Sequence, residues 1–507
     1  MSNIVFTGAR VWVDEARFEE RTLWVSDGRV AALGGKNSTP EAGGRDDVRV
    51  VPFAGKYIIP SFVDAHFHLL AFAGKQLRCD LSEARGADDA VRLLAAWAAA
   101  HPGNTPVVGV DFDDSGWDDP ALPTRAALNA VSATRPVVAR RVCGHVAVVN
   151  DALLGALAQK KFIDAASGRI VEGAVFEANR LIRPPREAMV SAVDGAIGRL
   201  HALGITAIHD IVDESTLEVY VEGLEESDRP LRLDAYLHLP AASFEDARDR
   251  LEEASGVQAA GIKIFTDGSL GGRTAALHAP YADGPGNGEL LVGRADLVRE
   301  LKACRKLDIG CAVHAIGDRA LATVLDAMAE AGTGGARFRI EHAEIIGDAE
   351  LAACAKLGVP LVMQPNFVRN WGGEGGLYQN RLGAERWRHN NRFASLLRAG
   401  VPFVFSSDVM PAGPLYGIRG ATHHAVAEER IGPADALRRY TTEAARLWGN
   451  EDTRGIDIGA PADLTVLSGN PLLADVDGIA VEATFVGGWE VYRNPASATP
   501  KSNIKRR

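Results

Sequence analysis

Two histidines, His66 and His68, end the apolar run Ser61-Phe-Val-Asp-Ala-His66-Phe-His68. If this run is a β-strand, side chains two positions apart point to the same side of it. Two imidazoles aimed together suit one metal ion. Taken alone, the pair fits equally well two polar residues at the end of a strand.

Three further apolar runs end in residues of metal-binding type. They are Cys311-Ala-Val-His314, Arg339-Ile-Glu-His342 and Phe405-Ser-Ser-Asp408. Residues so far apart in the chain meet if their strands are parallel neighbours in a barrel, because the carboxyl ends of those strands open on one face. The pattern predicts a cluster of four histidines and one carboxylate on that face.

Lys263 lies inside another apolar run, Gly261-Ile-Lys263-Ile-Phe-Thr-Asp267. An unpaired ammonium group in such a strand is costly, and burial depresses its pKa. A neutral lysine amine can react with carbon dioxide to form a carbamate, and that anion could bridge to a second metal. The alternative is an ion pair with Asp267, and the sequence leaves both open.

Positioning these residues requires a repeated βα pattern. Eight strand-like runs alternate with helical stretches, of which 187–203, 294–307 and 319–330 carry apolar residues three and four positions apart. This alternation is typical of a parallel sheet and predicts an α/β fold, a (β/α)8 TIM barrel. The runs are Tyr57–His68, Ile205–Asp210, Leu231–His238, Gly261–Asp267, Ile309–Ile316, Phe338–Ala343, Val359–Pro365 and Val401–Asp408.

More than one domain is expected. Short β-like runs at both ends of the chain predict a composite β-sandwich from 1–58 and 455–495. The barrel is expected at 59–73 and 186–454, and 496–507 is read as a tail. The long gap after the first barrel strand predicts an inserted subdomain at 74–185 over the barrel mouth, since the loops on that side open on the catalytic face.

Composition excludes several protein classes. The chain has 507 residues, 47% of them hydrophobic, and a net charge of −11. This acidity disfavours nucleic acid and membrane surfaces as partners, and no apolar run approaches the length of a transmembrane helix. The five cysteines form no CxxC motif, and the first residues do not resemble a signal peptide. A cytoplasmic protein acting on a small-molecule substrate is expected.

The motifs together resemble the amidohydrolase superfamily, and in particular its YtcJ-like (amidohydrolase-3) branch, whose relatives include N-substituted formamide deformylases. Gly144-His145 and Ala174-Val-Phe-Glu177 in the insertion support the branch. The other motifs span most of the chain: Pro60-Ser-Phe-Val-Asp-Ala-His-Phe-His68, Lys263-Ile-Phe-Thr-Asp-Gly-Ser269, Val313-His-Ala-Ile-Gly-Asp-Arg-Ala320, Ile340-Glu-His-Ala343, Ser406-Ser-Asp408 and Gly459-Ala-Pro-Ala-Asp-Leu464.

The resemblance implies a ligand set and a reaction. His66 and His68 would bind one metal with Asp408, His314 and His342 would bind a second, and a carboxylated Lys263 would bridge them. One or two divalent ions are expected; zinc is favoured, and iron, manganese or nickel also fit these ligands. Asp408 would shuttle the proton while metal-activated water cleaves a non-peptide C–N bond of an amide, an N-substituted formamide or a related small molecule.

The sequence leaves several alternative functions open. The chain could be a ring-opening cyclic amidase of the hydantoinase or dihydroorotase type, an aminohydrolase, or a non-catalytic ligand-binding or regulatory homologue. A homodimer would be ordinary for a large enzyme of this build. Six residues are further candidates for substrate binding, each with a structural role as the alternative: His145, His209, His238, Trp117, Trp371 and Arg319.

Overall fold

Eight parallel strands form the central barrel of the computed structural model, which describes residues 3–35, 48–158, 160–171, 173–252, 257–447, 455–473 and 475–497. The predicted TIM barrel is confirmed. Around the barrel the strands follow one another in chain order: β6 (Phe62–Phe67), β13 (Ile205–Asp213), β14 (Arg232–His238), β15 (Val257–Phe265), β16 (Gly310–Ala315), β17 (Phe338–His342), β18 (Leu361–Met363) and β19 (Phe403–Phe405).

The first and last strands meet where the barrel closes. The amide of Asp408 donates to the carbonyl of His66 at 3.1 Å. The amide of Ser407 donates to Asp64 Oδ1 at 2.9 Å, and the Ser407 hydroxyl binds the same carboxylate. These bonds bring the chain ends that carry the first histidine pair and the aspartate together on one face.

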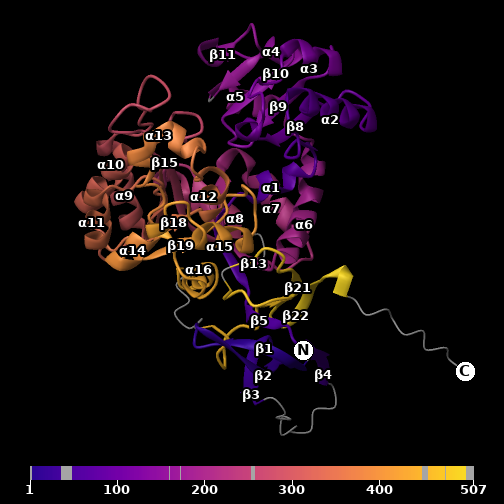
Figure 1. The fold of residues 1–507 in the computed structure, drawn as a ribbon, viewed down its shortest axis with the longest axis vertical. Helices are drawn as coiled ribbons and strands as arrows, with labels where there is room; N and C mark the ends of the chain where they lie inside the picture. The colour runs from indigo at the N-terminus through magenta and orange to yellow at the C-terminus, as the bar shows by residue number, and fades with distance from the viewer. Residues whose placement is uncertain are drawn as a thin grey trace, which may run out of the picture.

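Helices cover the outside of the barrel (Figure 1). Helices α6, α9 and α10 occupy the predicted helical stretches, and α10 buries Leu321, Val324 and Met328 against the strands. Its apolar residues recur every three to four positions, as a helix facing a core requires. The covering helices are α6 (Arg186–Ala202), α7 (Leu217–Glu225), α8 (Phe244–Glu252), α9 (Arg294–Leu307), α10 (Asp318–Ala331), α11 (Asp348–Leu357), α14 (Phe393–Ala399) and α16 (Pro433–Arg439).

Further helices occupy the segments between the barrel elements. They are α1 (Leu69–Lys75), α12 (Pro365–Trp371), α13 (Leu377–Trp387), α15 (Pro414–Thr422) and α17 (Thr442–Arg446). None of the helices in the described ranges combines the length and apolarity needed to cross a membrane.

Strands from both ends of the chain form a separate β domain, in the order β22-β21-β20-β5-β1-β2-β3 with β4 beside β1. The expectation that Tyr57–His68 is one barrel strand was wrong in its first part. Tyr57–Pro60 is β5 and pairs with β20, and only β6 joins the barrel. The apolar run is continuous because both strands are buried, so hydrophobicity does not mark the change of sheet.

The bounds of this domain's strands are β1 (Asn3–Val13), β2 (Arg17–Ser26), β3 (Arg29–Gly34), β4 (Val48–Pro52), β5 (Tyr57–Pro60), β20 (Leu464–Leu467), β21 (Val481–Val486) and β22 (Trp489–Arg493). Of the expected tail, residues 498–507 lie outside the described part of the chain.

A third sheet is formed by residues that lie between β6 and β13 in the sequence. It lies above the barrel in Figure 1. Its six strands are β7 (Cys79–Asp80), β8 (Val107–Phe112), β9 (Val137–Arg141), β10 (Val146–Val149), β11 (Ile163–Asp164) and β12 (Arg169–Val171). It is accompanied by α2 (Ala87–Ala100), α3 (Arg125–Val131), α4 (Asp151–Leu154) and α5 (Gly173–Leu181). Two apolar clusters, one on α2 and α3 and one on α5, give this segment a core of its own.

Candidate metal centre

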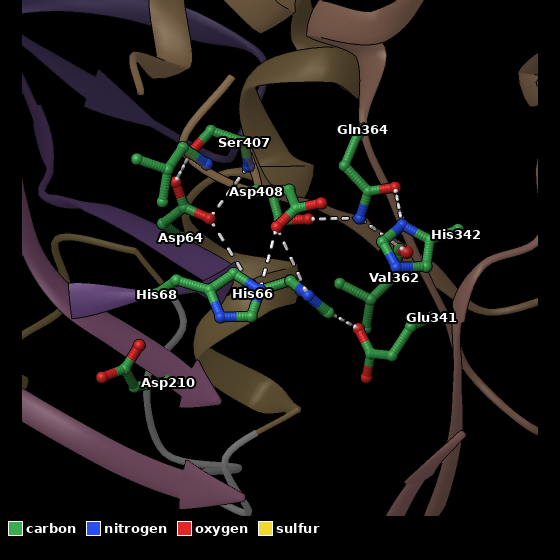
Figure 2. Close-up of polar contacts among 12 residues, drawn as sticks. Asp64, His66, His68, Asp210, Glu341, His342, Val362, Gln364, Ser407 and Asp408 are labelled. Carbon is green, nitrogen blue, oxygen red and sulfur yellow. Dashed lines mark hydrogen bonds and ion pairs between the residues drawn. The ribbon is translucent and has the colours of Figure 1, made fainter. Parts of the chain in front are cut away.

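His66, His68 and Asp408 come together at the barrel mouth, as Figure 2 shows. Asp408 Oδ1 lies 3.1 Å from His68 Nε2 and 3.7 Å from His66 Nε2. One ligand atom from each of the three residues lies within 4.8 Å of the other two. The two imidazoles therefore point at the same place, as the i, i+2 spacing predicts, and a carboxylate meets them there.

The second pair of histidines continues this cluster. The His342 ring centroid is 4.9 Å from that of His66 and 4.5 Å from that of His314. His342 also has a φ of 71°, a left-handed conformation that a non-glycine residue adopts only where its surroundings hold it. The four imidazoles thus form one continuous group, although their strands begin more than 250 residues apart.

Hydrogen bonds set which nitrogen each ring presents. His66 Nδ1 donates to Glu341 Oε2 at 2.5 Å, and His342 Nδ1 donates to Gln364 Oε1 at 2.8 Å. Both rings therefore keep Nε2 free to bind a metal. His314 is reversed: its Nε2 donates to the carbonyl of Gly268 at 3.1 Å, and its Nδ1 is buried without a hydrogen-bond partner in the described structure.

Lys263 does not form the alternative ion pair with Asp267. The Asp267 carboxylate instead accepts hydrogen bonds from three backbone amides, those of Ala276, Ile316 and Gly317. Lys263 Nζ is buried, has no hydrogen-bond partner among the described residues, and lies 4.9 Å from the Phe265 ring. Burial lowers the pKa of this lysine to about 8.

The surroundings keep His66 and His342 neutral and Asp408 ionised. Burial, reinforced by the nearby charge of Lys263, holds the pKa of His66 well below its usual value. Burial likewise lowers the pKa of His342. For Asp408 burial acts in the opposite sense, but the hydrogen bond with His68 and the neighbouring charges outweigh it and lower the pKa of the carboxyl group. For His68 burial acts against the charged form, but the hydrogen bond and charge of Asp408 outweigh it and raise the pKa of the imidazole. Neutral imidazole and ionised carboxylate are the forms that bind metals.

The donor set fits a divalent transition metal. Imidazole nitrogens with carboxylate oxygen suit zinc and its neighbours in the first transition row. Two unpartnered atoms support a metal most directly. His314 Nδ1 and Lys263 Nζ are both buried without a hydrogen-bond partner in the described structure, and burying such polar atoms costs free energy. A bound cation and a carbamate on the lysine would satisfy both.

Two of the proposed substrate-binding residues border this cluster. Trp371 on α12 contacts Phe367, whose ring stacks at 6.4 Å on His342, and Trp371 Nε1 donates to Asp113 of the insertion at 3.1 Å. His238 lies edge-on to Phe265 at 4.9 Å, and Phe265 in turn lies 5.3 Å from His314.

The other four proposed residues serve structural contacts. Trp117 is buried in the core of the insertion and donates to the Ala84 carbonyl at 2.8 Å. His209 is buried beneath the site, where it accepts from Arg339 at 2.6 Å. Arg319 donates to the Gly288 carbonyl and so ties α10 to the loop after β15.

His145 remains within the insertion, where its ring lies 5.8 Å from that of Phe176. Neither His145 nor His209 belongs to the group of possible metal ligands formed by His66, His68 and Asp408.

Sequence reasoning missed two partners of the ligands. Glu341 immediately precedes His342, yet it serves the histidine of another strand, and its second oxygen lies 2.6 Å from Arg339 Nε. Gln364 directly follows β18 and accepts a hydrogen bond from His342 of β17. Polar residues at the ends of two barrel strands were the available signal, but the choice of partner depends on neighbouring strands.

Comparison with known proteins identifies the family of the chain. A model of the Amidohydrolase family, Amidohydro_3, matches residues 49–492. The chain is 28% identical to the putative amidohydrolase YtcJ of Bacillus subtilis (strain 168), over 93% of this chain and 95% of that protein. It is 25% identical to the N-substituted formamide deformylase of Arthrobacter pascens, over 98% and 99%.

A solved structure described as an uncharacterized metal-dependent hydrolase from Pyrococcus horikoshii OT3 superposes with a TM-score of 0.75 at 28% identity, covering 93% of this chain and 98% of that one. The family match spans far more than half of the sequence and includes every strand of the barrel, so the predicted resemblance is confirmed. The chain belongs to the amidohydrolase family.

Proposed function

We propose that this protein is a metal-dependent hydrolase that cleaves a non-peptide C–N bond of a small molecule, an amide or an N-substituted formamide. The observation that carries the proposal is the convergence of His66, His68 and Asp408, with two more histidines and an unpartnered lysine beside them. Each position at which the family resemblance implies a metal ligand carries a residue able to bind a metal, which argues against a non-catalytic homologue. The formamide deformylase relative supports the choice of bond.

His66, His68 and Asp408 would hold one divalent ion, and His314 and His342 a second, with zinc the favoured metal. A carboxylated Lys263 would supply the shared anion. When bound, the metal lowers the pKa of a water molecule toward neutrality and polarises the substrate carbonyl. The ring partners Glu341 and Gln364 contribute by fixing the two imidazoles before substrate arrives.

Asp408 is proposed to move the proton. Its pKa lies below the usual range, so the carboxylate is ionised at neutral pH and able to accept a proton from the attacking water. It would then deliver that proton to the leaving nitrogen. Phe265 lies against His314, and Phe367, which contacts Trp371, lies against His342; these rings would exclude bulk water from that side of the reacting bond.

The test combines metal content with turnover. Protein purified without chelator is analysed by elemental mass spectrometry, then assayed on formamides, linear amides, cyclic amides and aminopyrimidines. We expect one to two metal ions per chain and hydrolysis of the formamides or linear amides. Turnover of cyclic amides alone, or of aminopyrimidines alone, would select the ring-opening or the aminohydrolase alternative. No bound metal and no uptake of added zinc would contradict the proposal.

Asp408→Asn tests the role of the aspartate. We expect the variant to fold and to lose turnover by about 10³-fold, because the amide cannot accept the proton, although some of the loss will reflect weaker metal binding. Metal content is therefore measured for the same samples. A variant that turns over at the wild-type rate would remove Asp408 from the mechanism.

A further inference from the structure

A group of basic side chains lies where the insertion meets the barrel. Lys75 is the last residue of α1, the helix that begins directly after His68, and Arg78 follows it. Asp111 on β8 and Arg140 on β9 approach from the insertion. Figure 1 shows α1 between these strands and the barrel. We call Lys75, Arg78 and Arg140 the basic cluster.

The charges of the basic cluster do not balance. Lys75 Nζ forms an ion pair with Asp111 Oδ2 at 2.8 Å, which uses the one carboxylate that the described residues bring there. Arg140 donates to the neutral amide oxygen of Asn179 at 3.1 Å. The Arg78 guanidinium makes no hydrogen bond or ion pair with any described residue, and its Nε is buried. Two positive charges are left without a matching anion.

Arg141, the neighbour of Arg140 in the sequence, is an arginine whose charge is matched by carboxylates. Its Nε and NH2 groups pair with Asp114 at 2.5 Å and Asp113 at 2.8 Å. The insertion thus supplies two carboxylates to Arg141 and none to Arg78. Burial, followed by the nearby charge of Arg140, lowers the pKa of Arg78 to about 9. Such an arrangement is unfavourable unless an anion from outside completes it.

The basic cluster is close to the metal centre along the chain and in space. Lys75 Nζ donates to the carbonyl of Val409 at 3.1 Å, and Val409 follows Asp408 directly. The seven residues of α1 separate Lys75 from His68 by about 10 Å of helix. We take the length of α1 as the approximate separation between a carbonyl held at the metal centre and an anion bound at Arg78 and Arg140.

We infer that Arg78 and Arg140 bind a carboxylate carried by the substrate, remote from the bond that is cleaved. The inference rests on the proposed function for the identity of that bond. Guanidinium groups present paired N–H donors that match the two oxygens of a carboxylate. The substrates expected are amides or formamides of amino acids whose carboxylate stands several methylene groups from the nitrogen.

The binding test does not depend on turnover. The probe is a keto acid with five methylene groups between a methyl ketone, which replaces the scissile amide, and the carboxylate; its neutral carboxamide is the matched probe. Melting temperatures of the metal-loaded protein are measured with each probe at constant ionic strength. We expect the keto acid to raise the melting temperature by at least about 2 °C more than the carboxamide does.

Single-residue variants test whether the carboxylate of the probe binds at Arg78 and Arg140. Arg78→Gln and Arg140→Gln should each abolish the difference between the two probes. Arg78→Gln should also raise the melting temperature without any probe, because it removes an unpaired, half-buried charge. Arg92→Gln, on the exposed surface of α2, is the control and should change neither result. A difference that persists in both cluster variants, or is missing in the wild type, overturns the inference.

Two further measurements distinguish a carboxylate site from a phosphate site, and the binding site from the proposed reaction. Inorganic phosphate at the same concentration should give a smaller shift than the keto acid, and an equal or larger shift would make this a free-phosphate site and overturn the carboxylate assignment. Turnover is compared for the formamide of a five-carbon ω-amino acid and for the same molecule with its carboxylate replaced by a carboxamide. The kcat/KM of the carboxylate substrate should be at least ten-fold higher, because its KM is lower. A keto-acid shift without hydrolysis of either would sink the proposed reaction but leave the carboxylate site standing.

Discussion

Glu341 links the metal centre to the interior of the barrel. One of its oxygens accepts from His66 at 2.5 Å, and the other lies 2.6 Å from Arg339, which also donates to the carbonyl of Ala65 at 3.1 Å. All of these groups are fully buried or nearly so. A carboxylate partner fixes the tautomer of a ligand histidine and increases its basicity. Glu341 is therefore a positioning residue.

We expect Glu341→Gln to weaken metal binding by about 10- to 100-fold, since the amide is a poorer partner for the imidazole. The same change leaves Arg339 as an unpaired buried charge and should cost about 3 kcal/mol of unfolding free energy. Competition with a chromogenic chelator measures the first effect, and urea unfolding of the metal-free protein measures the second.

The double variant Glu341→Gln/Arg339→Met separates the two effects. Removing the arginine charge should recover part of the stability and none of the metal affinity. If metal affinity returned together with stability, Glu341 would be acting only on the fold.

Lys263 offers a second test at this scale. Its amine is buried without a hydrogen-bond partner in the described residues, so replacing it with methionine of similar volume should stabilise the metal-free protein by a few degrees in melting temperature. The same variant should hold at least one metal ion fewer per chain than the wild type, as measured by elemental mass spectrometry. A less stable variant with unchanged metal content would assign Lys263 a purely structural role.

At the scale of elements, the barrel strands were predictable because each is a short buried run with a polar residue at its carboxyl end. The proposed ligands His66, His314 and His342 follow from that rule alone. The roles of Glu341 and His209 do not, because both are strand residues of ordinary appearance whose partners belong to other strands. Sequence patterns report which face of a strand is buried, and they do not report which side chains meet across the barrel.

The contacts of the insertion are difficult to predict from the sequence for a different reason. Trp117 and Trp371 are both aromatic residues in loops, yet Trp117 packs inside the insertion whereas Trp371 joins the insertion to α12 through Asp113. The difference depends on how the inserted sheet is placed over the barrel, and that placement leaves no periodic signal in the sequence.

Gly261 shows how closely β15 and β16 approach next to Lys263. A Cβ atom at this position would lie 2.0 Å from the carbonyl oxygen of Gly310. Gly261→Ala must therefore push the two strands apart, at a cost of about 1–3 kcal/mol, and displace the strand that carries Lys263. We expect a lower melting temperature and reduced metal content. Gly116→Ala, where a Cβ meets no atom within 4 Å, is the control and should match the wild type.

At the scale of the whole molecule, the three sheets have separate tasks. The barrel carries the proposed metal ligands, the insertion contributes Arg140 to the basic cluster, and β21 and β22 of the β domain pack against α6. His201, near the end of α6, is part of this last contact: its carbonyl accepts from Thr484 of β21 at 2.7 Å, and its Nε2 donates to the carbonyl of Pro230 at 2.9 Å.

This contact should make stability depend on pH. Burial lowers the pKa of His201 to about 4 in the folded protein, against about 6.5 in the unfolded chain. The unfolded state therefore binds more protons between these values, and stability falls as the pH decreases through that window. The stability is complete above pH 6.5, and the loss amounts to about 3 kcal/mol of unfolding free energy by pH 4. His201→Gln keeps an N–H donor without the titration, so its unfolding free energy should decline less steeply over this range. Urea unfolding from pH 7 to pH 4, with chelator present so that metal loss contributes nothing, measures the two slopes, and parallel curves would show that His201 is not the group responsible.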